Sequence, residues 1–376
     1  MKIAIDLTII PDQKTGVGQY AKRLIEAMSA FDKKNQYLIF VKKNQVSDFD
    51  PKKENFRIFP CSAWLRFKIL RILWEQFILP VRLEHEKTDI LHSLHYTTPL
   101  FGNFRRLVTF HDMTFFLFPE KHTLAKKVYF KFFIPRSAAI SDRLIAVSQN
   151  TKNDIQKIIG IPFDKIDVVY ETANPIFSFK KDDLTAQAIK TRYGIKNKFI
   201  LSVGTLEPRK NIAGLINAYH DLVLHKGIDC QLVIVGKKGW LYQDMFQAVK
   251  DMGLQKNIVF TDYVPDEDLV VLYNAAEIFV YPSLYEGFGI PPLEALTCGV
   301  PTITSNISSM PEVVGDGAVL IDPADSAELS RAIYELLVNE KFRAEIIKKG
   351  LMRSKIFCNE KLAQDMTAVY LRTMAS

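Results

Sequence analysis

The chain has 376 residues, of which 48% are hydrophobic and 24% charged, a balance that is typical of a soluble globular protein with room for two domains. The four cysteines are widely scattered and no pair has zinc-ligand or C-x-x-C spacing, so they indicate buried thiols of a reducing compartment. No uninterrupted apolar run approaches the length of a transmembrane helix, and Met1 leads directly into an expected strand without a signal-peptide pattern. We therefore expect a cytoplasmic protein.

The net charge of +7 is unevenly distributed. Residues 1–180 hold 28 Lys and Arg against 18 Asp and Glu, and residues 181–376 hold 21 against 24, so the two halves carry +10 and −3. A basic first half favours an anionic partner there, such as a membrane face, a lipid diphosphate or nucleic acid. A solvated basic surface is an equally good interpretation.

Strand-like and helix-like segments alternate through the first half, which is the rhythm of a parallel sheet covered on both faces. The expected strands are Lys2–Leu7, Tyr37–Val41, Arg57–Phe59, Ile90–His92, Leu107–His111, Arg143–Val147 and Ile166–Val169. The expected helices are Val17–Phe31, Trp64–Leu79, Leu124–Ala139 and Thr151–Ile159, the last capped by Ser148.

A polar stretch, Ser178–Asp183, interrupts the rhythm, which then starts again. Expected strands are Phe199–Val203, Gln231–Val235, Ile258–Phe260, Ile278–Tyr281, Thr302–Thr304 and Val319–Ile321. Expected helices are Ile212–His225, Tyr242–Met252, Asp266–Ala275, Pro292–Thr297, Ala327–Val338, Glu340–Ile356 and Lys361–Met374.

The pattern predicts an α/β protein with two doubly wound, Rossmann-like parallel-sheet domains. The domains are 1–180 and 181–357, and the final helix, about 358–376, can pack back on the first domain. Because ligands of such sheets bind beyond the carboxyl ends of the strands, the natural site is a cleft between the domains. No G-x-G-x-x-G follows a strand and no Walker lysine motif is present, which argues against a dehydrogenase or an ATPase.

The motif E-G-F-G-I-P-P-L-E, from Glu286 to Glu294, joins an expected strand to an expected helix. A helix start after a Gly-rich loop presents free N–H groups to an anion. An ionised glutamate only accepts hydrogen bonds, so Glu286 suits sugar hydroxyls rather than phosphate. A site for both phosphate and hydroxyl groups indicates a nucleotide sugar.

The motif S-V-G-T-L-E-P-R-K-N, from Ser202 to Asn211, places Arg209 and Lys210 just before a helix. Cations are unfavourable at a helix N-terminus, and a diphosphate bound between them removes the conflict. A solvated loop is the alternative. Lys237 and Lys238, after the next strand, could approach the nucleotide or be solvated.

Two features of the first half are further candidates. Gly16 and Gly18, in T-G-V-G-Q-Y, allow close backbone approach to a ligand, although a plain helix-entry turn fits as well. His111 ends the strand V-T-F-H-D and is placed to reach a ligand. The alternative is a structural histidine that is hydrogen-bonded to its neighbours. His92 and His95 could line an acceptor side or be structural.

The pairing of G-T-L-E-P-R-K-N with E-G-F-G-I-P-P-L-E closely resembles the retaining glycosyltransferases of the GT-B fold, and most nearly the family-four "group 1" enzymes, many of them bacterial mannosyltransferases. Relatives often carry an arginine after the first glycine, where this chain has Thr205. The resemblance implies catalytic roles for His111 and Glu286 at the donor sugar. It implies diphosphate contacts for the following group: Gly16, Gly18, Arg209, Lys210, Phe288, Gly289 and Ile290. It also implies a ribose contact for Glu294 and base contacts for Tyr263 and Val264.

The function implied is transfer of a hexose from a nucleoside-diphosphate sugar, with GDP-mannose favoured, to a glycan or lipid-linked acceptor for a surface polysaccharide. Neither a metal nor a cofactor is expected, and nucleic acid is not an expected partner. The rivals are a UDP-sugar transferase, an epimerase on the same fold and a non-catalytic nucleotide-sugar binding protein.

The segment Ala63–Pro80 combines aromatic and aliphatic residues with Arg66, Lys68 and Arg71. Such a helix could lie on an anionic membrane as a peripheral anchor. Its apolar spacing equally fits a helix that packs on the sheet. The acidic triplet D-F-D at 48–50 is interpreted as a surface turn rather than a metal site.

Overall fold

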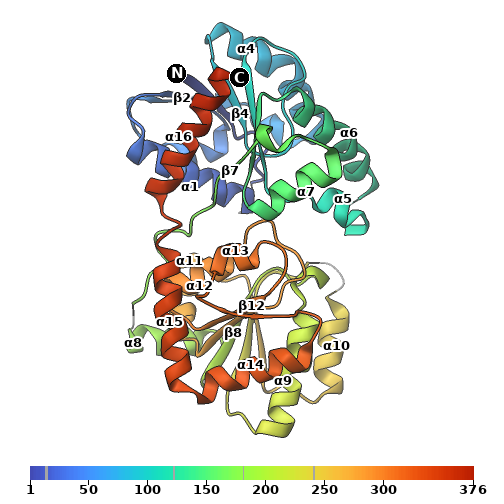
Figure 1. Ribbon diagram of the computed structural model, residues 1–376, viewed down its shortest axis with the longest axis vertical. Coiled ribbons are helices and arrows are strands. Elements are labelled where there is room, and N and C mark those ends of the chain that lie inside the picture. Colours follow the sequence, from blue (N-terminus) through green and yellow to red (C-terminus); the bar gives the residue numbers. More distant parts are fainter. Residues whose placement is uncertain (13–15, 122, 181, 240–241) are drawn as a thin grey trace. The chain divides into compact units, whose positions relative to one another are not determined.

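The computed structural model describes residues 1–12, 16–121, 123–180, 182–239 and 242–376. Thr15 of the glycine motif therefore lies outside the described residues. The chain divides into two units, Met1–Thr172 with Cys358–Ser376, and Ala173–Phe357 (Figure 1). Each unit holds one wholly parallel sheet with helices on both faces, so the predicted α/β class is confirmed.

The sheet of the first unit has seven strands in the order β3-β2-β1-β4-β5-β6-β7. The strands are β1 Lys2–Asp6, β2 Gln36–Lys42, β3 Phe56–Cys61, β4 Ile90–Ser93, β5 Arg105–Phe110, β6 Arg143–Ala146 and β7 Ile166–Val168. Strand order reverses between β1 and β4, which is where ligands of doubly wound sheets bind.

Alternate residues of β1 serve two cores, as the period of a strand requires. Ile3 and Ile5 face a cluster with α1 and α16, whereas Ala4 packs with Leu79 and Leu83 on the other face. The helices of this unit are α1 Gly16–Phe31, α2 Val46–Phe49, α3 Lys68–Leu73, α4 Leu79–His85, α5 Thr114–Leu117, α6 Leu124–Ile140, α7 Gln149–Ile159 and α16 Asn359–Ala375.

The last helix, α16, is the final part of the first unit's core. Figure 1 shows it beside α1, and Leu362, Met366 and Tyr370 are buried in the same cluster as the α1 residues. The Tyr370 hydroxyl also lies 3.0 Å from Nδ1 of His92 in β4. Residues from the two ends of the chain therefore share one core.

The second unit has six strands in the order β10-β9-β8-β11-β12-β13, reversing between β8 and β11. Its strands are β8 Phe199–Val203, β9 Gln231–Val235, β10 Ile258–Asp262, β11 Ile278–Tyr281, β12 Thr302–Ser305 and β13 Val319–Ile321. Its helices are α8 Asp183–Arg192, α9 Ile212–Lys226, α10 Gln243–Asp251, α11 Asp266–Ala275, α12 Ile290–Thr297, α13 Met310–Val314, α14 Ser326–Val338 and α15 Glu340–Ser354.

Two local predictions have clear outcomes. The Ser148 side chain accepts a hydrogen bond from the Thr151 N–H at 3.0 Å, which confirms it as the cap of α7. The polar stretch at 178–183 runs into a helix that the sequence interpretation missed, α8, and Asp182 caps it by accepting from the Thr185 N–H. Asp48 lies in the short helix α2 rather than in a simple turn.

The predicted single helix Trp64–Leu79 is wrong, because the segment is divided into four shorter elements. The segment is a 3-10 turn, Ala63–Arg66, then α3, a π-helical turn, Trp74–Ile78, and α4. The expectation that it packs on the sheet is confirmed in part: Leu65, Trp74 and Leu79 are buried in one cluster with sheet residues. Other apolar side chains of the segment face water, among them Ile69 and Phe77, which are 74% and 63% exposed. No helix within the described ranges has the length and hydrophobicity of a membrane span.

We expect Met366→Ala in α16 to lower the free energy of unfolding by about 2–5 kcal/mol, because it leaves a cavity in the core of the first unit. Leu371→Ala in the same helix removes an exposed side chain and should change it by less than about 0.5 kcal/mol. Denaturant unfolding followed by circular dichroism measures both. Equal effects would mean that α16 is not part of that core.

Candidate functional site

The loops after β8 and β11 meet at the point where the strand order of the second unit reverses. A 3-10 turn after β8, Pro208–Lys210, carries Lys210, and the loop after β11 carries Glu286. Lys210 Nζ lies 2.6 Å from Glu286 Oε1, and both side chains are nearly inaccessible to water. The two motifs singled out from the sequence therefore form one cluster.

Arg209 holds the two loops together. Its guanidinium contacts Glu286 Oε2 at 2.8 Å, Glu207 Oε1 at 2.7 Å, and the Tyr285 carbonyl at 2.6 Å. The Arg209 carbonyl in turn accepts from the Leu284 N–H and the Ser283 hydroxyl. With so many fixed partners, Arg209 primarily orients Glu286 and the loop.

Glu286 is a buried carboxylate with several partners. Oε1 accepts hydrogen bonds from the Ser283 hydroxyl at 2.7 Å and the Tyr281 hydroxyl at 2.9 Å, in addition to Lys210. Burial opposes the charge, but Arg209 and Lys210 outweigh it and lower the pKa of Glu286 to about 2. The carboxylate is thus fully ionised at neutral pH.

Burial acts the other way on Lys210. Desolvation lowers the pKa of Lys210, and the attraction of Glu286 opposes this shift. Because the pKa of Glu286 is so low, we take the Lys210–Glu286 pair as ionised at neutral pH. The ammonium group of Lys210 has three protons. Among the described residues it donates two of them, to the Tyr281 hydroxyl and to Glu286. The third proton can therefore be donated to a ligand.

The loop after Glu286 is fixed by two serines. The Ser308 and Ser309 hydroxyls donate to the Glu286 carbonyl at 2.7 and 3.0 Å, and Ser309 lies 2.6 Å from the Phe288 carbonyl oxygen. Gly289 has a φ of +122°, and a Cβ there would lie 2.4 Å from Met310 Cε. The positive φ favours glycine at this entry to α12, and any side chain there would also displace Met310 of α13.

Helix α12 begins at Ile290 and has prolines at its next two positions. Proline carries no N–H, so the donors at this helix end come from Gly289 and Ile290. Backbone N–H groups at a helix N-terminus favour an anion. Whether Phe288, Gly289 and Ile290 face a bound diphosphate stays a prediction.

The remaining second-unit candidates surround the same strand ends. Glu294 is buried in α12, and its Oε2 lies 3.3 Å from the Tyr273 hydroxyl. Tyr263 follows β10 with an exposed ring, over which Lys237 Nζ lies at 5.0 Å, whereas Val264 is buried. An exposed aromatic ring is a surface on which a nucleotide base can stack.

His111 follows β5 in the first unit and both ring nitrogens have partners. Nε2 donates to the Leu94 carbonyl at 2.8 Å, and Nδ1 lies 3.4 Å from Glu171 Oε1. Burial lowers the pKa of His111, but the Glu171 carboxylate and the Leu94 carbonyl outweigh it and raise the pKa. Tyr20 of α1 packs edge-on against the ring at 4.8 Å.

The other first-unit candidates separate into structural and open positions. His92 is fully buried between Tyr370 and Thr109, so its structural role is supported. Burial lowers the pKa of His95 to about 3, and its ring contacts aromatic neighbours. Gly16 and Gly18 lie in the first turn of α1, and no atom is close to the Cβ position of Gly16.

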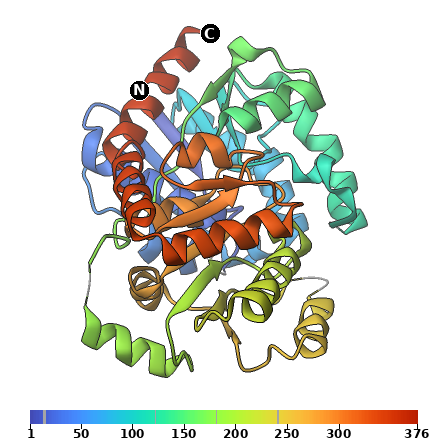
Figure 2. The ribbon, with the colours of Figure 1, turned by 60° about the horizontal axis from the view of Figure 1, so that its bottom comes forward.

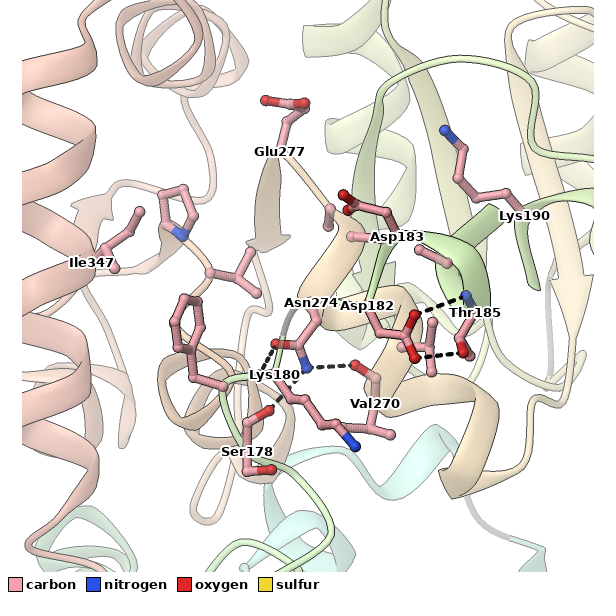
Figure 3. A pocket seen from close by; sticks show the side chains of 18 of the residues that line it. Ser178, Lys180, Asp182, Asp183, Thr185, Lys190, Val270, Asn274, Glu277 and Ile347 are labelled. Atoms are coloured by element: carbon pink, nitrogen blue, oxygen red, sulfur yellow. Dashed lines mark hydrogen bonds between the residues drawn. The ribbon is translucent and has the colours of Figure 1, made fainter. Parts of the chain in front are cut away.

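A separate pocket of about 940 Å³ lies away from this cluster, near the amino ends of β11 and β12 (Figure 3). It is lined by residues of α8, α11 and α15, among them Lys190, Asn274 and Arg343. The Asn274 side chain donates to the Ser178 carbonyl and accepts from the Lys180 N–H. Helix α8 lies at the lower left of Figure 2, and its Ile189 is buried in one core cluster with Leu269 and Tyr273 of α11.

Sequence reasoning missed the groups that position the candidates. Tyr281 and Ser283 lie in Y-P-S directly before the second motif, and Glu207 lies inside the first, so proximity to the motifs was the available signal. Glu171 is 60 residues from His111 and no local pattern connects them. Ser308 and Ser309 are likewise brought in by the fold alone.

Comparison with known proteins supplies two family matches. The family model described as glycosyl transferases group 1 matches residues 186–352, and that described as glycosyltransferase family 4 matches residues 14–175. O-antigen chain mannosyltransferase B of Escherichia coli is 31% identical, covering 98% of this chain and 99% of its own. O-antigen chain mannosyltransferase RfbU of Salmonella typhimurium is 30% identical, covering 69% of this chain and 67% of its own.

Solved structures share the fold. Sucrose-phosphate synthase from Thermosynechococcus elongatus superposes with a TM-score of 0.77 at 20% identity, covering 100% of this chain and 99% of its own. HepE of Anabaena, in complex with UDP and glucose, gives a TM-score of 0.75 at 18% identity, covering 99% of each chain. These are glycosyltransferases of the GT-B fold, so the predicted fold is confirmed.

We expect Glu286 to make stability depend on acid pH. Its folded pKa of about 2 lies below the ordinary 4.5, so its contribution is present above pH 4.5 and is lost as pH falls toward 2. The difference corresponds to about 3 kcal/mol. Glu286→Gln should have a lower free energy of unfolding than wild type at pH 7. The difference between the two proteins should decrease as pH falls from 4.5 toward 2, as measured by denaturant unfolding. A constant gap would contradict the assigned ion pairs.

Proposed function

Because the chain belongs to the group 1 glycosyltransferases of family four, we propose that it transfers mannose from GDP-mannose to a glycan or lipid-linked acceptor in surface polysaccharide biosynthesis. The similarity to two O-antigen mannosyltransferases supports the sugar and the process. We further propose that it works in the cytoplasm, at the inner face of the membrane, with retention of anomeric configuration.

The observation that carries the proposal is the convergence of Lys210, Arg209 and Glu286 beside the start of α12. The donor diphosphate gains negative charge as it leaves. Lys210 and the N–H groups of Gly289 and Ile290 would stabilise that charge where it develops. Electrostatic stabilisation of this kind requires no metal, and none is proposed.

Glu286 is suited to hold the sugar rather than to react with it. A carboxylate whose pKa is about 2 is a weak base, but it remains an acceptor for hydroxyl groups at any physiological pH. We therefore propose that Glu286 orients the mannose hydroxyls. In the absence of an assigned covalent nucleophile, we propose front-face substitution, in which a donor phosphate oxygen takes the proton of the acceptor hydroxyl.

The remaining residues complete the donor contacts. We propose that His111, held by Glu171 and the Leu94 carbonyl, contacts the donor sugar near its reacting carbon. Glu294 would accept hydrogen bonds from the ribose hydroxyls. Tyr263 and Val264 would lie at the base, and Gly16 and Gly18 would allow close approach of the α1 backbone to the diphosphate.

We expect GDP and GDP-mannose to raise the melting temperature of the protein more than UDP, ADP and their sugars, because a ligand that binds only the folded state stabilises it in proportion to its affinity. Lys210→Met should lower the melting temperature of the free protein and abolish most of the ligand-induced shift, with circular dichroism checking that the variant is folded. Differential scanning fluorimetry with the panel measures it. If UDP-glucose alone raised the melting temperature, the assignment of GDP-mannose as the donor would be wrong.

We expect Glu286→Ala to lower kcat for transfer by about 10²–10³, because it removes sugar orientation and frees Lys210 from its partner. His111→Asn should also lower kcat and retain GDP binding. Transfer of radiolabelled mannose measures turnover, and proton NMR of the product reads its anomeric configuration. Donor conversion without an acceptor would indicate an epimerase, and binding without turnover a binding protein.

A further inference from the structure

The segment from Ala63 to His85 packs on the sheet through Leu65, Trp74, Leu79 and Leu83, but it also buries three polar side chains and exposes many apolar ones. Arg71, Glu75 and Gln76 are buried, at 9%, 2% and 7% exposure. The large apolar side chains on the same stretch point to water: Trp64, Phe67, Ile69, Leu70, Leu73, Phe77, Ile78 and Val81 are all exposed. A surface helix of a water-soluble protein normally turns its apolar side chains to the core, so eight exposed ones on one short segment are unusual.

A network of polar contacts holds the segment in this orientation. Arg71 pairs with Glu75 and lies 3.4 Å from the Tyr129 hydroxyl of α6. The Gln76 amide donates to the Thr98 carbonyl at 3.3 Å and accepts from the Leu100 N–H at 3.0 Å. Glu75 and Gln76 lie in the π-helical turn Trp74–Ile78, a distortion that is frequent at functional sites.

Helix α6 extends the same surface. The Arg71–Tyr129 contact joins it to α3, and Leu124, Val128 and Phe132 of α6 are exposed. We call these side chains, with the eight exposed ones of the 63–81 stretch, the apolar-basic face. Within residues 63–81 and 124–140 the exposed charges are positive, since Arg66, Lys68, Lys126, Lys131 and Arg136 are accessible and residues 124–140 contain no Asp or Glu. Glu84, beyond Val81, is an exposed carboxylate of the same segment.

We propose that the apolar-basic face docks on an anionic lipid bilayer. Clustered aromatic and aliphatic side chains ringed by lysine and arginine match the acyl boundary and the anionic headgroups of a membrane surface. A second copy of this chain is disfavoured as occupant, because two equally basic faces would repel each other. Docking through this face requires neither the donor nor the acceptor to be bound. It would bring the protein to the membrane in which the proposed lipid-linked acceptor lies.

The test is co-sedimentation of the full-length protein with vesicles, in the absence of any sugar. We expect binding to vesicles of phosphatidylcholine with phosphatidylglycerol, weaker binding to phosphatidylcholine alone, and weakening by salt. Ile69→Glu with Phe77→Glu should lower the partition coefficient at least about tenfold, because it places two carboxylates on the buried side of the contact.

The matched control is Leu184→Glu with Leu224→Glu, which changes the charge equally at exposed apolar residues of the second unit. The control should bind vesicles as wild type does, and all four substitutions should leave the melting temperature unchanged. Equal loss in both double variants, or no binding of wild type to anionic vesicles, would overturn the proposal. Concentration-dependent dimers abolished by I69E/F77E, without vesicle binding, would assign the face to a second copy instead.

Failure here and failure of the proposed function are distinguishable. The vesicle assay contains no nucleotide, and the donor panel contains no lipid. If the protein binds GDP-mannose but does not bind vesicles, the proposed docking surface is wrong and the proposed function stands.

Discussion

The structure of the second unit depends on a buried group of charges. Arg209 and Lys210 face Glu207 and Glu286, two cations against two carboxylates, with little water to solvate any of them. Such a group is tolerable only when every charge is paired, so removal of one member is far more costly than its individual contacts suggest. The pairing fixes the positions of the loops after β8 and β11, and thereby orients Gly289 and the start of α12.

This balance also shapes how a diphosphate can enter. The cations are already neutralised by carboxylates, so the local charge alone does not attract an anion. What remains directional is the third proton of Lys210 and the backbone donors before Pro291. Diphosphate binding therefore depends on directed hydrogen bonds more than on an excess of positive charge. Directed hydrogen bonds select a ligand by its shape.

Much of the fold was accessible from the sequence, because most strands are continuous apolar runs with clear turn signals, as in β8, β9 and β11. The chemistry-bearing loops were also accessible, since Glu286 and Lys210 stand in compact motifs. The partners of His111 were not, because Glu171 joins it only through the strand order. The burial of Arg71 and Glu75 was not accessible either, because a helical pattern places charged side chains in water.

The closing helix has a consequence for how the molecule forms. Leu362, Met366 and Tyr370 fill the core that Ile3, Ile5 and α1 begin, so the first unit is incomplete until α16 has been synthesised. The second unit, Ala173–Phe357, is contiguous and has no such requirement. On the ribosome, the first unit therefore completes its core only after the second unit has been synthesised. The apolar side chains that α16 covers stay exposed during that time.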